Sequence, residues 1–588
     1  SVNVQYSQYP GEVMTEPEGS FPNKYKEVVW DQNYYVADVY GTYNKSFNEK
    51  HNLTVIGGYN YEAKYFRDLT AANDGLLSED LSDFNLAKGT NNFTLNGGRN
   101  EYAIMGLFYR VAYDYKGKYL AEVNGRYDGT SRFPRGKRYG FFPSFSAAYR
   151  ISEEAFFEPL RKTVDNLKIR LSYGSLGNQQ IGYYDFIQTI TTKGSMGDYS
   201  FDGTILGQHA TVSDPVSGDQ TWEKVVSKNL GLDLNMFSNR LSLTADFYIR
   251  DTKGILGTGK KLPSIYGATE PQVNSSDLRT KGYELVLGWR DSFKLAGSTF
   301  SYGITGTFSD YTAEYTKCDT PSGLIGGPYV GKKYGEIWGY KVDGLFRNDE
   351  EAAEYASRVD LSKVAAGYYS ATGAYGKGVR GGDIKYLDLD GSGIVDGGKG
   401  TLEDPGDRRV IGNSSPRYQY GLTLNFSWYG FDFSVFMQGI GRLDWYPGAD
   451  NLRFWGPYSR PYATFIPKNF MSQVWSEDNP DAYLPRARAY TSLNASSGTA
   501  YYTNDRYLQN LAYCRLKNLT VGYTIPKRLT SKVGIKECRV YFSGENLATW
   551  SALKNDFLDP EQAAADKDKK SNVYPWCRTY SVGLNLTF

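Results

Sequence analysis

The sequence predicts an all-β fold, a transmembrane antiparallel β-barrel, from three observations. Segment after segment alternates apolar and polar residues with period 2, which gives each strand one apolar and one polar face. Short turns alternate with long polar segments along the chain. Charged residues occupy alternate strand positions, and this pattern fits a polar lumen better than a soluble core. Because lipid offers no hydrogen-bond partners, strands that span it must close into a barrel.

The final segment, 578–588, shows the alternation most clearly. Its apolar face consists of Tyr580, Val582, Leu584, Leu586 and Phe588. Five such side chains are about the length that a tilted strand needs to cross a bilayer. A terminal aromatic residue is typical of outer-membrane barrels, so we expect these five residues to form the insertion signal. Taken alone, the segment also fits an edge strand of a soluble sheet.

The composition agrees with a barrel. The 588 residues carry a net charge of +1, so the charge does not indicate a nucleic-acid partner. Mean hydropathy is −0.52, and no apolar run is long enough for a helical membrane span. The 52 Tyr suit interfacial girdles and sugar-stacking surfaces. The four Cys show no metal or disulfide-scaffold spacing. The first residues lack a signal peptide, which is expected of a mature chain or a fragment.

About fifteen strands are expected along the chain. The first two, 33–47 and 52–62, form a hairpin, as do the next two, 103–113 and 119–128. The others are expected near 141–151, 166–175, 227–236, 240–250, 281–291, 297–309, 418–428, 431–440, 509–524, 538–547 and 576–588. Further short turns are expected at 236–240, 292–296 and 429–430.

Long loops are expected between these hairpins. They cover 65–100, 176–226, 251–280, 310–417, 441–508 and 548–575. Residues 1–32 are expected to form an extracellular loop segment, and 33–588 the carboxy-terminal part of the barrel. Bacterial outer-membrane barrels usually have an even number of strands. The odd count therefore predicts that strands are missing before residue 1.

Ordered sequence blocks connect the chain to a known family. Three of them are GRYDGTSRF at 125–133, RYGFFPSFSAAYR at 138–150 and DIKYLDLDGSG at 383–393. Others lie at 168–178, 221–223, 229–233, 245–248, 252–253, 281–284, 339–346, 407–413, 516–526, 540–547 and 559–561. With these blocks, the sequence resembles the carboxy-terminal portion of a SusC/RagA-type TonB-dependent outer-membrane transporter.

The resemblance implies a 22-stranded barrel, of which this chain would supply about 15 strands. The family's plug, TonB box and first strands are absent from this sequence. We therefore expect an amino-terminal fragment, from a proteolytic nick or a split gene, to carry the plug and the remaining strands.

The resemblance also implies a function and its partners. We expect active import of a nutrient across the outer membrane of a gram-negative bacterium, driven by TonB acting on the plug. A SusD-like lipoprotein would act as a hinged lid. The favoured cargo is an oligosaccharide. The alternatives are an oligopeptide cargo and a passive porin.

Two sets of residues are candidates for substrate binding. Exposed aromatic rings stack on the apolar faces of sugars, and the segment 441–508 offers Trp445, Trp455, Tyr458, Tyr462 and Trp475. The same rings could instead pack on the lid or anchor the barrel at the membrane interface. The second set consists of charged residues of the lumen, Arg126, Asp128 and Arg132. These charges could line the substrate cavity, but we favour the alternative that they bind the plug.

One loop has the chemistry of a structural calcium site, although no cofactor is required. It offers oxygen atoms at alternate positions from Asp388, Asp390, Ser392 and Asp396. The twelfth position is Lys399 instead of Glu, so Asp404 or Asp407 would have to replace that ligand. The alternative is an Asp-Gly turn without a metal.

Enzymatic activity is not expected. The only two histidines, His51 and His209, lie far apart and away from Cys, and no nucleophile elbow is present. An outer-membrane hydrolase and a barrel-based adhesin are therefore disfavoured.

Overall fold

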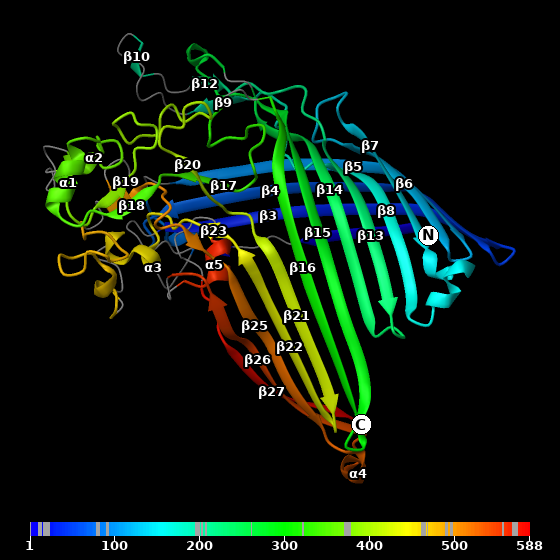
Figure 1. The fold of residues 1–588 in the computed structure, drawn as a ribbon. Helices are drawn as coiled ribbons and strands as arrows, with labels where there is room; N and C mark the ends of the chain where they lie inside the picture. The colour runs from blue at the N-terminus through cyan, green and yellow to red at the C-terminus, as the bar shows by residue number, and fades with distance from the viewer. Residues whose placement is uncertain are drawn as a thin grey trace. The chain divides into compact units, whose positions relative to one another are not determined.

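The computed structural model (Figure 1) describes most of the 588 residues. The described residues are 2–9, 14–15, 24–77, 83–89, 93–193, 200–201, 204–205, 209–259, 262–319, 323–369, 378–459, 466, 468–488, 492–493, 498–554, 558–566 and 574–588.

One antiparallel sheet dominates the structure. Among the described residues it contains seventeen strands, of which β1 (Val2–Tyr9) and β2 (Met14–Thr15) are short and both pair with β3. The other fifteen are β3 (Lys24–Phe47), β4 (His51–Asp74), β5 (Thr94–Tyr115), β6 (Tyr119–Thr130), β7 (Tyr139–Arg150), β8 (Val164–Asn178), β13 (Glu223–Met236), β14 (Leu241–Thr258), β15 (Gln272–Leu295), β16 (Ser298–Cys318), β21 (Arg417–Trp428), β22 (Phe431–Arg442), β25 (Tyr513–Thr524), β26 (Glu537–Ser551) and β27 (Thr579–Thr587). The predicted all-β class and the count of about fifteen strands are confirmed.

Shorter elements lie in the connections between these strands. The small strand pairs are β9 (Ile190–Lys193) with β12 (His209–Val212), β10 (Ser200–Phe201) with β11 (Thr204–Ile205), β17 (Glu336–Gly339) with β20 (Arg409–Asn413), β18 (Val342–Leu345) with β19 (Ile384–Tyr386), and β23 (Asp444–Trp445) with β24 (Gln509–Asn510). The α-helices are α1 (Asp349–Ala356), α2 (Ala366–Tyr369), α3 (Leu452–Trp455), α4 (Lys527–Thr530) and α5 (Pro560–Ala565). None of the described helices is both long and apolar enough to cross a membrane.

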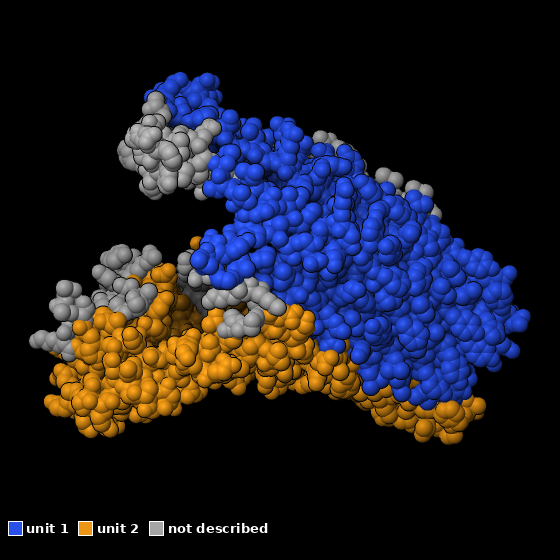
Figure 2. All heavy atoms as spheres, turned by 90° about the horizontal axis from the view of Figure 1, so that it is seen from above, with its two compact units in different colours: residues 1–154, 169–230, 250–278 blue, residues 155–168, 231–249, 279–588 orange. Residues whose placement is uncertain are grey.

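The chain divides into two compact units (Figure 2). Unit 1 comprises 1–154, 169–230 and 250–278, and unit 2 comprises 155–168, 231–249 and 279–588. Within unit 1, β3 to β7 pair consecutively. Within unit 2, β16 pairs with β21, followed in order by β22, β25, β26 and β27.

The strands place their apolar side chains on an exposed face, as the alternation predicts. On β27 and at the residue after it, the five apolar side chains are 40–79% exposed. The neighbouring strand continues this surface, because Val540 lies opposite Leu584 and Phe542 opposite Val582. Strands of this kind are suited to a lipid environment, because their backbone groups are hydrogen-bonded to one another and the side chains on their exposed face are apolar.

Glycines opposite tyrosines help to explain why both residues are abundant. Gly125 pairs with Tyr109, and a Cβ atom at Gly125 would lie 3.0 Å from the Tyr109 ring. Gly583 pairs with Tyr541 in the same way. The tyrosine ring therefore covers the glycine and fills the space of the missing side chain.

Most strands are longer than the sequence predicts, although β25 and β27 are shorter than the expected 509–524 and 576–588. The sequence predicts a loop over residues 1–32, but β1 and β2 lie there and β3 already begins at Lys24. The connections between β4 and β5, β8 and β13, β14 and β15, and β16 and β21 are correspondingly shorter than predicted, whereas the connection between β22 and β25 runs over 443–512 and is not. The turn expected at 292–296 is at 296–297. A tilted strand needs only about 9–11 residues to cross a bilayer, whereas β3 and β4 each have 24. In these two strands, backbone pairing therefore continues beyond the alternating segment that predicts a membrane-spanning strand.

Candidate functional site

The long connections of unit 2 pack into a small hydrophobic core of their own, which we call the loop core. It consists of buried residues from 340–395 and 443–511, together with Leu558 and Ala563. Trp455 is fully buried there, and its ring centroid lies 5.1 Å from that of Tyr507. The loops therefore form a folded platform at one end of the strands of unit 2 (Figure 1).

A buried asparagine organises the loop core. The amide nitrogen of Asn504 donates to the hydroxyl groups of Tyr386 and Tyr446 and to the carbonyl of Tyr502. Its amide oxygen accepts from the backbone N–H of Tyr507 at 3.1 Å. Asn504 is fully buried, and burial raises the pKa of Tyr386 well above its ordinary value. The hydroxyl of Tyr386 donates to the carbonyl of Thr499.

A buried ion pair joins two of the loops. The guanidinium of Arg488 donates to Asp383 through Nε at 2.9 Å and Nη2 at 2.6 Å. Arg488 also lies 4.2 Å from the ring centroid of Tyr368. Burial raises the pKa of the Asp383 carboxyl, and Arg488 opposes this effect. The bidentate geometry supplies the partners that such buried charges require.

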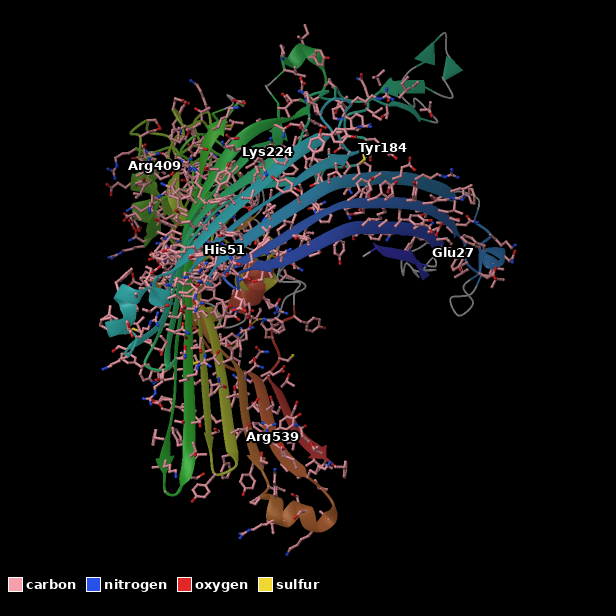
Figure 3. All side chains as sticks on the ribbon, turned by 90° about the vertical axis from the view of Figure 1, so that its right-hand side faces the viewer. Glu27, His51, Tyr184, Lys224, Arg409 and Arg539 are labelled. Carbon is pink, nitrogen blue, oxygen red and sulfur yellow. The ribbon has the colours of Figure 1, made fainter. Side chains whose placement is uncertain are left out.

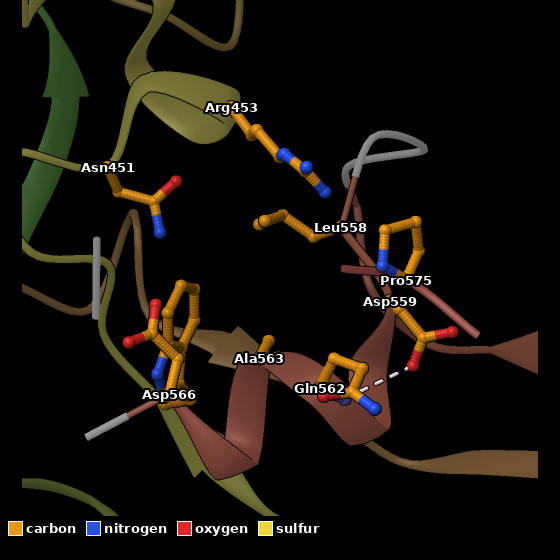
Figure 4. Close-up of a pocket in the computed structure, with 9 residues that line it drawn as sticks. Asn451, Arg453, Leu558, Asp559, Gln562, Ala563, Asp566 and Pro575 are labelled. Carbon is orange, nitrogen blue, oxygen red and sulfur yellow. Dashed lines mark hydrogen bonds between the residues drawn. The ribbon is translucent and has the colours of Figure 1, made fainter. Parts of the chain in front are cut away.

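A second set of charges attaches α5 to the sheet. The guanidinium of Arg515, on β25, donates to Asp559 and to Glu561. Asp559 also caps α5, since its carboxylate accepts from the backbone N–H groups of Glu561 and Gln562 (Figure 4). The small cavity in this figure has a volume of about 10 Å³, enough for about one water molecule.

A larger cavity of about 800 Å³ lies next to the loop core, a size that suits a small organic ligand. Its polar and aromatic lining includes Lys332, Glu336, Trp338, Arg408, Asp444 and Trp445. Burial lowers the pKa of Lys332, whose ammonium donates to two backbone carbonyls. Within the described part of the chain, the indole Nε1 of Trp445 and the Nε of Arg408 have no hydrogen-bond partner.

The three candidate charges of unit 1 do not form one group. Arg126 pairs with Asp128 on the same strand at 2.8 Å. Arg132 lies between the rings of Tyr102 and Tyr183, 4.2 and 4.9 Å from their centroids. The Arg126–Asp128 pair and Arg132 are therefore separate features, held by different neighbours.

The predicted calcium loop brings carboxylates together, with a changed ligand set. Ligand atoms of Asp388, Asp390 and Asp407 lie within 4.8 Å of one another. Asp396 is not in this group, and its carboxylate accepts from the backbone N–H of Gly398. Asp407 is fully buried and accepts from three backbone N–H groups, while burial raises its pKa. A hard cation fits this all-oxygen set.

Comparison with known proteins identifies the family. A sequence profile described as "TonB dependent receptor-like, beta-barrel" matches residues 2–547. The chain belongs to this family. The predicted resemblance to SusC/RagA-type TonB-dependent transporters is also confirmed.

The receptor barrel has relatives among curated proteins. It is 27% identical over 576 residues to TonB-dependent receptor P3 of Formosa agariphila, covering 94% of this chain and 52% of that protein. It is 22% identical over 499 residues to TonB-dependent receptor SusC of Bacteroides thetaiotaomicron, covering 82% of this chain and 44% of that protein. The chain spans about half the length of the curated relatives that it matches.

Solved structures show the same fold. The structure of the RagAB peptide transporter has a TM-score of 0.74 at 20% identity, over 100% of this chain and 59% of that chain. The RagAB peptide importer in the "closed-closed" state has a TM-score of 0.73 at 21% identity, with the same coverage.

In this receptor barrel, the candidate aromatic rings are not an exposed stacking surface. Trp445, Trp455, Tyr458 and Trp475 are at most 6% exposed, because they fill the loop core. The expected exposure is therefore wrong for these four rings. Tyr462 lies outside the described residues.

Of the four described rings, Trp445 lines both cavities, so contact with a substrate stays a prediction for it. Sequence reasoning missed Trp338 and Arg408 beside it. Arg408 lies inside the family block 407–413, and Trp338 directly precedes the block 339–346. These two sequence blocks were the signal from which Trp338 and Arg408 could have been found.

Proposed function

We propose that this receptor barrel takes part in TonB-dependent active import of a nutrient across the outer membrane. The observation that carries the proposal is the family match over residues 2–547. The exposed apolar faces of the strands support placement in a lipid bilayer as an integral, multi-pass β-barrel. No catalytic step is needed for this function.

The proposal includes three protein partners. A SusD-like lipoprotein would cover the extracellular side as a lid, by analogy with the SusC and RagAB relatives. An amino-terminal segment outside this sequence would supply the plug and further strands, since the chain covers about half of its curated relatives. TonB would act through that plug.

For the cargo, we propose an oligosaccharide. SusC is among the curated relatives, and the cavity beside the loop core combines indole rings with charged groups. An oligopeptide is the second candidate, because the solved structures that share the fold include a peptide transporter. The third candidate function is a passive porin, which would need no energy, whereas import of either cargo by a TonB-dependent transporter would.

Deletion of the gene in its host tests this function. We expect the deletion strain to lose growth on the transported oligosaccharide and to recover it with the intact gene. Uptake should also stop when the proton gradient is collapsed. Uptake that persists without the gradient would support a passive pore, and lost growth on peptides alone would identify the peptide cargo.

We also propose that the loop containing Asp388, Asp390 and Asp407 holds a structural calcium ion. All three carboxylates already accept backbone N–H groups, so the loop is shaped before any ion binds. Bound calcium would add charge neutralisation to this cluster and leave the import mechanism unchanged.

A further inference from the structure

The connection between β25 and β26 differs from the other turns at its end of unit 2. The neighbouring turns at 296–297 and 429–430 have two residues each and no charge. The connection at 525–536 instead folds into α4 and the 3₁₀-helix η9 (Ser531–Val533). Gly534, with a φ of 73°, ends η9 in a left-handed conformation that favours glycine. The connection is therefore a folded element with a fixed surface.

This connection, which we call the basic turn, carries only positive charges. Its charged residues are Lys527, Arg528, Lys532 and Lys536, all exposed, and it contains no Asp or Glu. None of the described carboxylates forms a salt bridge with these four cations. The charge is therefore available to an external anion.

The basic turn also exposes apolar side chains. Leu529 is 53% and Val533 is 71% exposed, although Thr530 between them is buried. Exposed apolar residues among cations are the pattern of segments that lie in a membrane interface, with the apolar groups in the acyl region and the cations at the headgroups. A soluble anion would not explain the exposed Leu529 and Val533.

Aromatic residues place this end of the strands at such an interface. Phe293, Tyr429 and Phe431 are 50–55% exposed there. The Phe431 and Tyr523 ring centroids are 4.5 Å apart, directly before the basic turn. The hydroxyl of Tyr429 donates to the carbonyl of Ala296 in the adjacent turn at 2.7 Å. Membrane barrels carry aromatic girdles at the lipid–water boundary, and α4 lies just beyond this one, beside the C-terminus (Figures 1 and 3).

The two-residue turns at 296–297 and 429–430 lie at this end of the strands, and short turns are typical of the periplasmic side of outer-membrane barrels. We propose that the basic turn binds anionic phospholipid headgroups, such as phosphatidylglycerol, in the periplasmic leaflet. Lys527, Arg528, Lys532 and Lys536 would contact the phosphates, while Leu529 and Val533 enter the acyl region. The inference goes beyond import and rests on the proposed outer-membrane placement alone. Each cation near an anionic surface strengthens binding roughly fivefold, so the four together should give a clear lipid preference.

The test is lipid binding by the receptor expressed from its natural gene, purified from the outer membrane and depleted of lipid. Phosphatidylglycerol or phosphatidylethanolamine is titrated in, and native mass spectrometry measures the bound lipid. We expect phosphatidylglycerol to bind more tightly, and replacement of the four cations by Gln to weaken its binding by up to about several hundredfold. The double variant Leu529→Ser with Val533→Ser should weaken both lipids.

A matched control separates the basic turn from general surface charge. It replaces four exposed cations of the loop region by Gln, namely Lys333, Arg347, Lys363 and Lys468, which also form no salt bridge with a described carboxylate. This control should retain the phosphatidylglycerol preference, and all variants should resist unfolding by dodecyl sulfate as the parent does. Equal phosphatidylglycerol binding by the parent and the basic-turn variant would overturn the proposal, as would equal loss in the control.

The same strains separate this inference from the proposed function. Absence of the receptor from the outer-membrane fraction would refute its placement there. A receptor that is present and active in import but shows no lipid preference would refute only the lipid site.

Discussion

Arg539 on β26 reaches Asp432 on β22 across the intervening strand β25. The Nε of Arg539 donates to Oδ1 of Asp432 at 2.8 Å. The contact passes over Gly522, whose missing side chain leaves the room, since a Cβ there would lie 2.4 Å from Oδ1 of Asp432 and 2.6 Å from Nε of Arg539. One glycine thus permits an ion pair to join β22 and β26 across β25, near the end of the sheet that carries the basic turn (Figure 3).

Replacing Gly522 by Val should therefore separate this ion pair. We expect a loss of stability of about 1–3 kcal/mol from overpacking, measured as a lower temperature of the folded-to-unfolded band shift in dodecyl sulfate gels. Gly41→Val is the control, because a Cβ at Gly41 meets no atom within 4 Å. If Arg539→Ala lowers stability as much in the Gly522→Val background as in the parent, the two residues are not coupled and the explanation fails.

Removing Arg488 should open the loop core without unfolding the barrel. Asp383 would be left as a buried charge without its bidentate partner, which costs about 3–5 kcal/mol. Limited proteolysis of Arg488→Met should show faster cleavage in the loops, while resistance of the strands to dodecyl sulfate is unchanged. The control is Arg486→Met, two residues away, whose contact with Asp349 is longer at 3.5 Å. Equal cleavage of the two variants would contradict a special role for Arg488.

The strands could be predicted from the sequence because their signal is local. Tyr580 and Val582 are separated by a single residue, and period 2 places both on one face without knowledge of any other strand. The loop core depends on contacts between distant segments, such as that of Trp455 with Tyr507. An indole ring has the same chemistry whether it covers a sugar or fills a core. Composition alone therefore identified the aromatic loop correctly but assigned the wrong exposure to its rings.

The helix α1 should loosen in acid through Glu351. Its carboxylate accepts from the backbone N–H of Arg347 and from the ammonium of Lys385. Burial, the largest single effect, raises the pKa of Glu351, but these hydrogen bonds together hold it below the ordinary value of 4.5. The ionised Glu351 carboxylate thus stabilises α1 fully above pH 4.5, and this stabilisation is lost as the pH falls through the lowered pKa.

Pepsin digestion between about pH 5 and pH 3 measures this effect. Cleavage near α1 should accelerate towards the lower pH in the parent. Glu351→Gln should show a smaller acceleration and, because the pair is partly exposed, cost less than about 1 kcal/mol at neutral pH. An identical pH profile for the parent and the variant would exclude Glu351 as the titrating group.

Calcium should protect the loop at 388–407 from proteolysis, and a chelator should remove the protection. The informative variant is Asp390→Asn, because Asp390 is exposed and its Oδ1 accepts from the N–H of Ser392. This variant should be cleaved at the rate of the chelated parent whether or not calcium is present. Asp407→Asn is expected to be cleaved faster still, since Asp407 organises the loop through three backbone N–H groups. Protection of Asp390→Asn by calcium would argue against this ligand set.

Replacing Trp338 by Ala should reduce import strongly while it changes the stability of the loop core little. Trp338 is half-buried on β17 and lines the 800 Å³ cavity, whereas Trp455 is fully buried and does not line that cavity. If the cavity receives cargo, Trp338→Ala should reduce the apparent affinity for cargo by about tenfold, the effect of one lost aromatic contact. Protease resistance of the loop core should change little.

Trp455→Ala provides the contrast for this test, because truncation of a fully buried indole costs about 3–5 kcal/mol. It should increase cleavage of the loops and reduce import together, as expected for loss of the fold. Import and protease resistance therefore change together in Trp455→Ala but separately in Trp338→Ala. Normal import by Trp338→Ala would show that cargo does not depend on this wall of the cavity, and the binding position would then have to be sought elsewhere in the receptor.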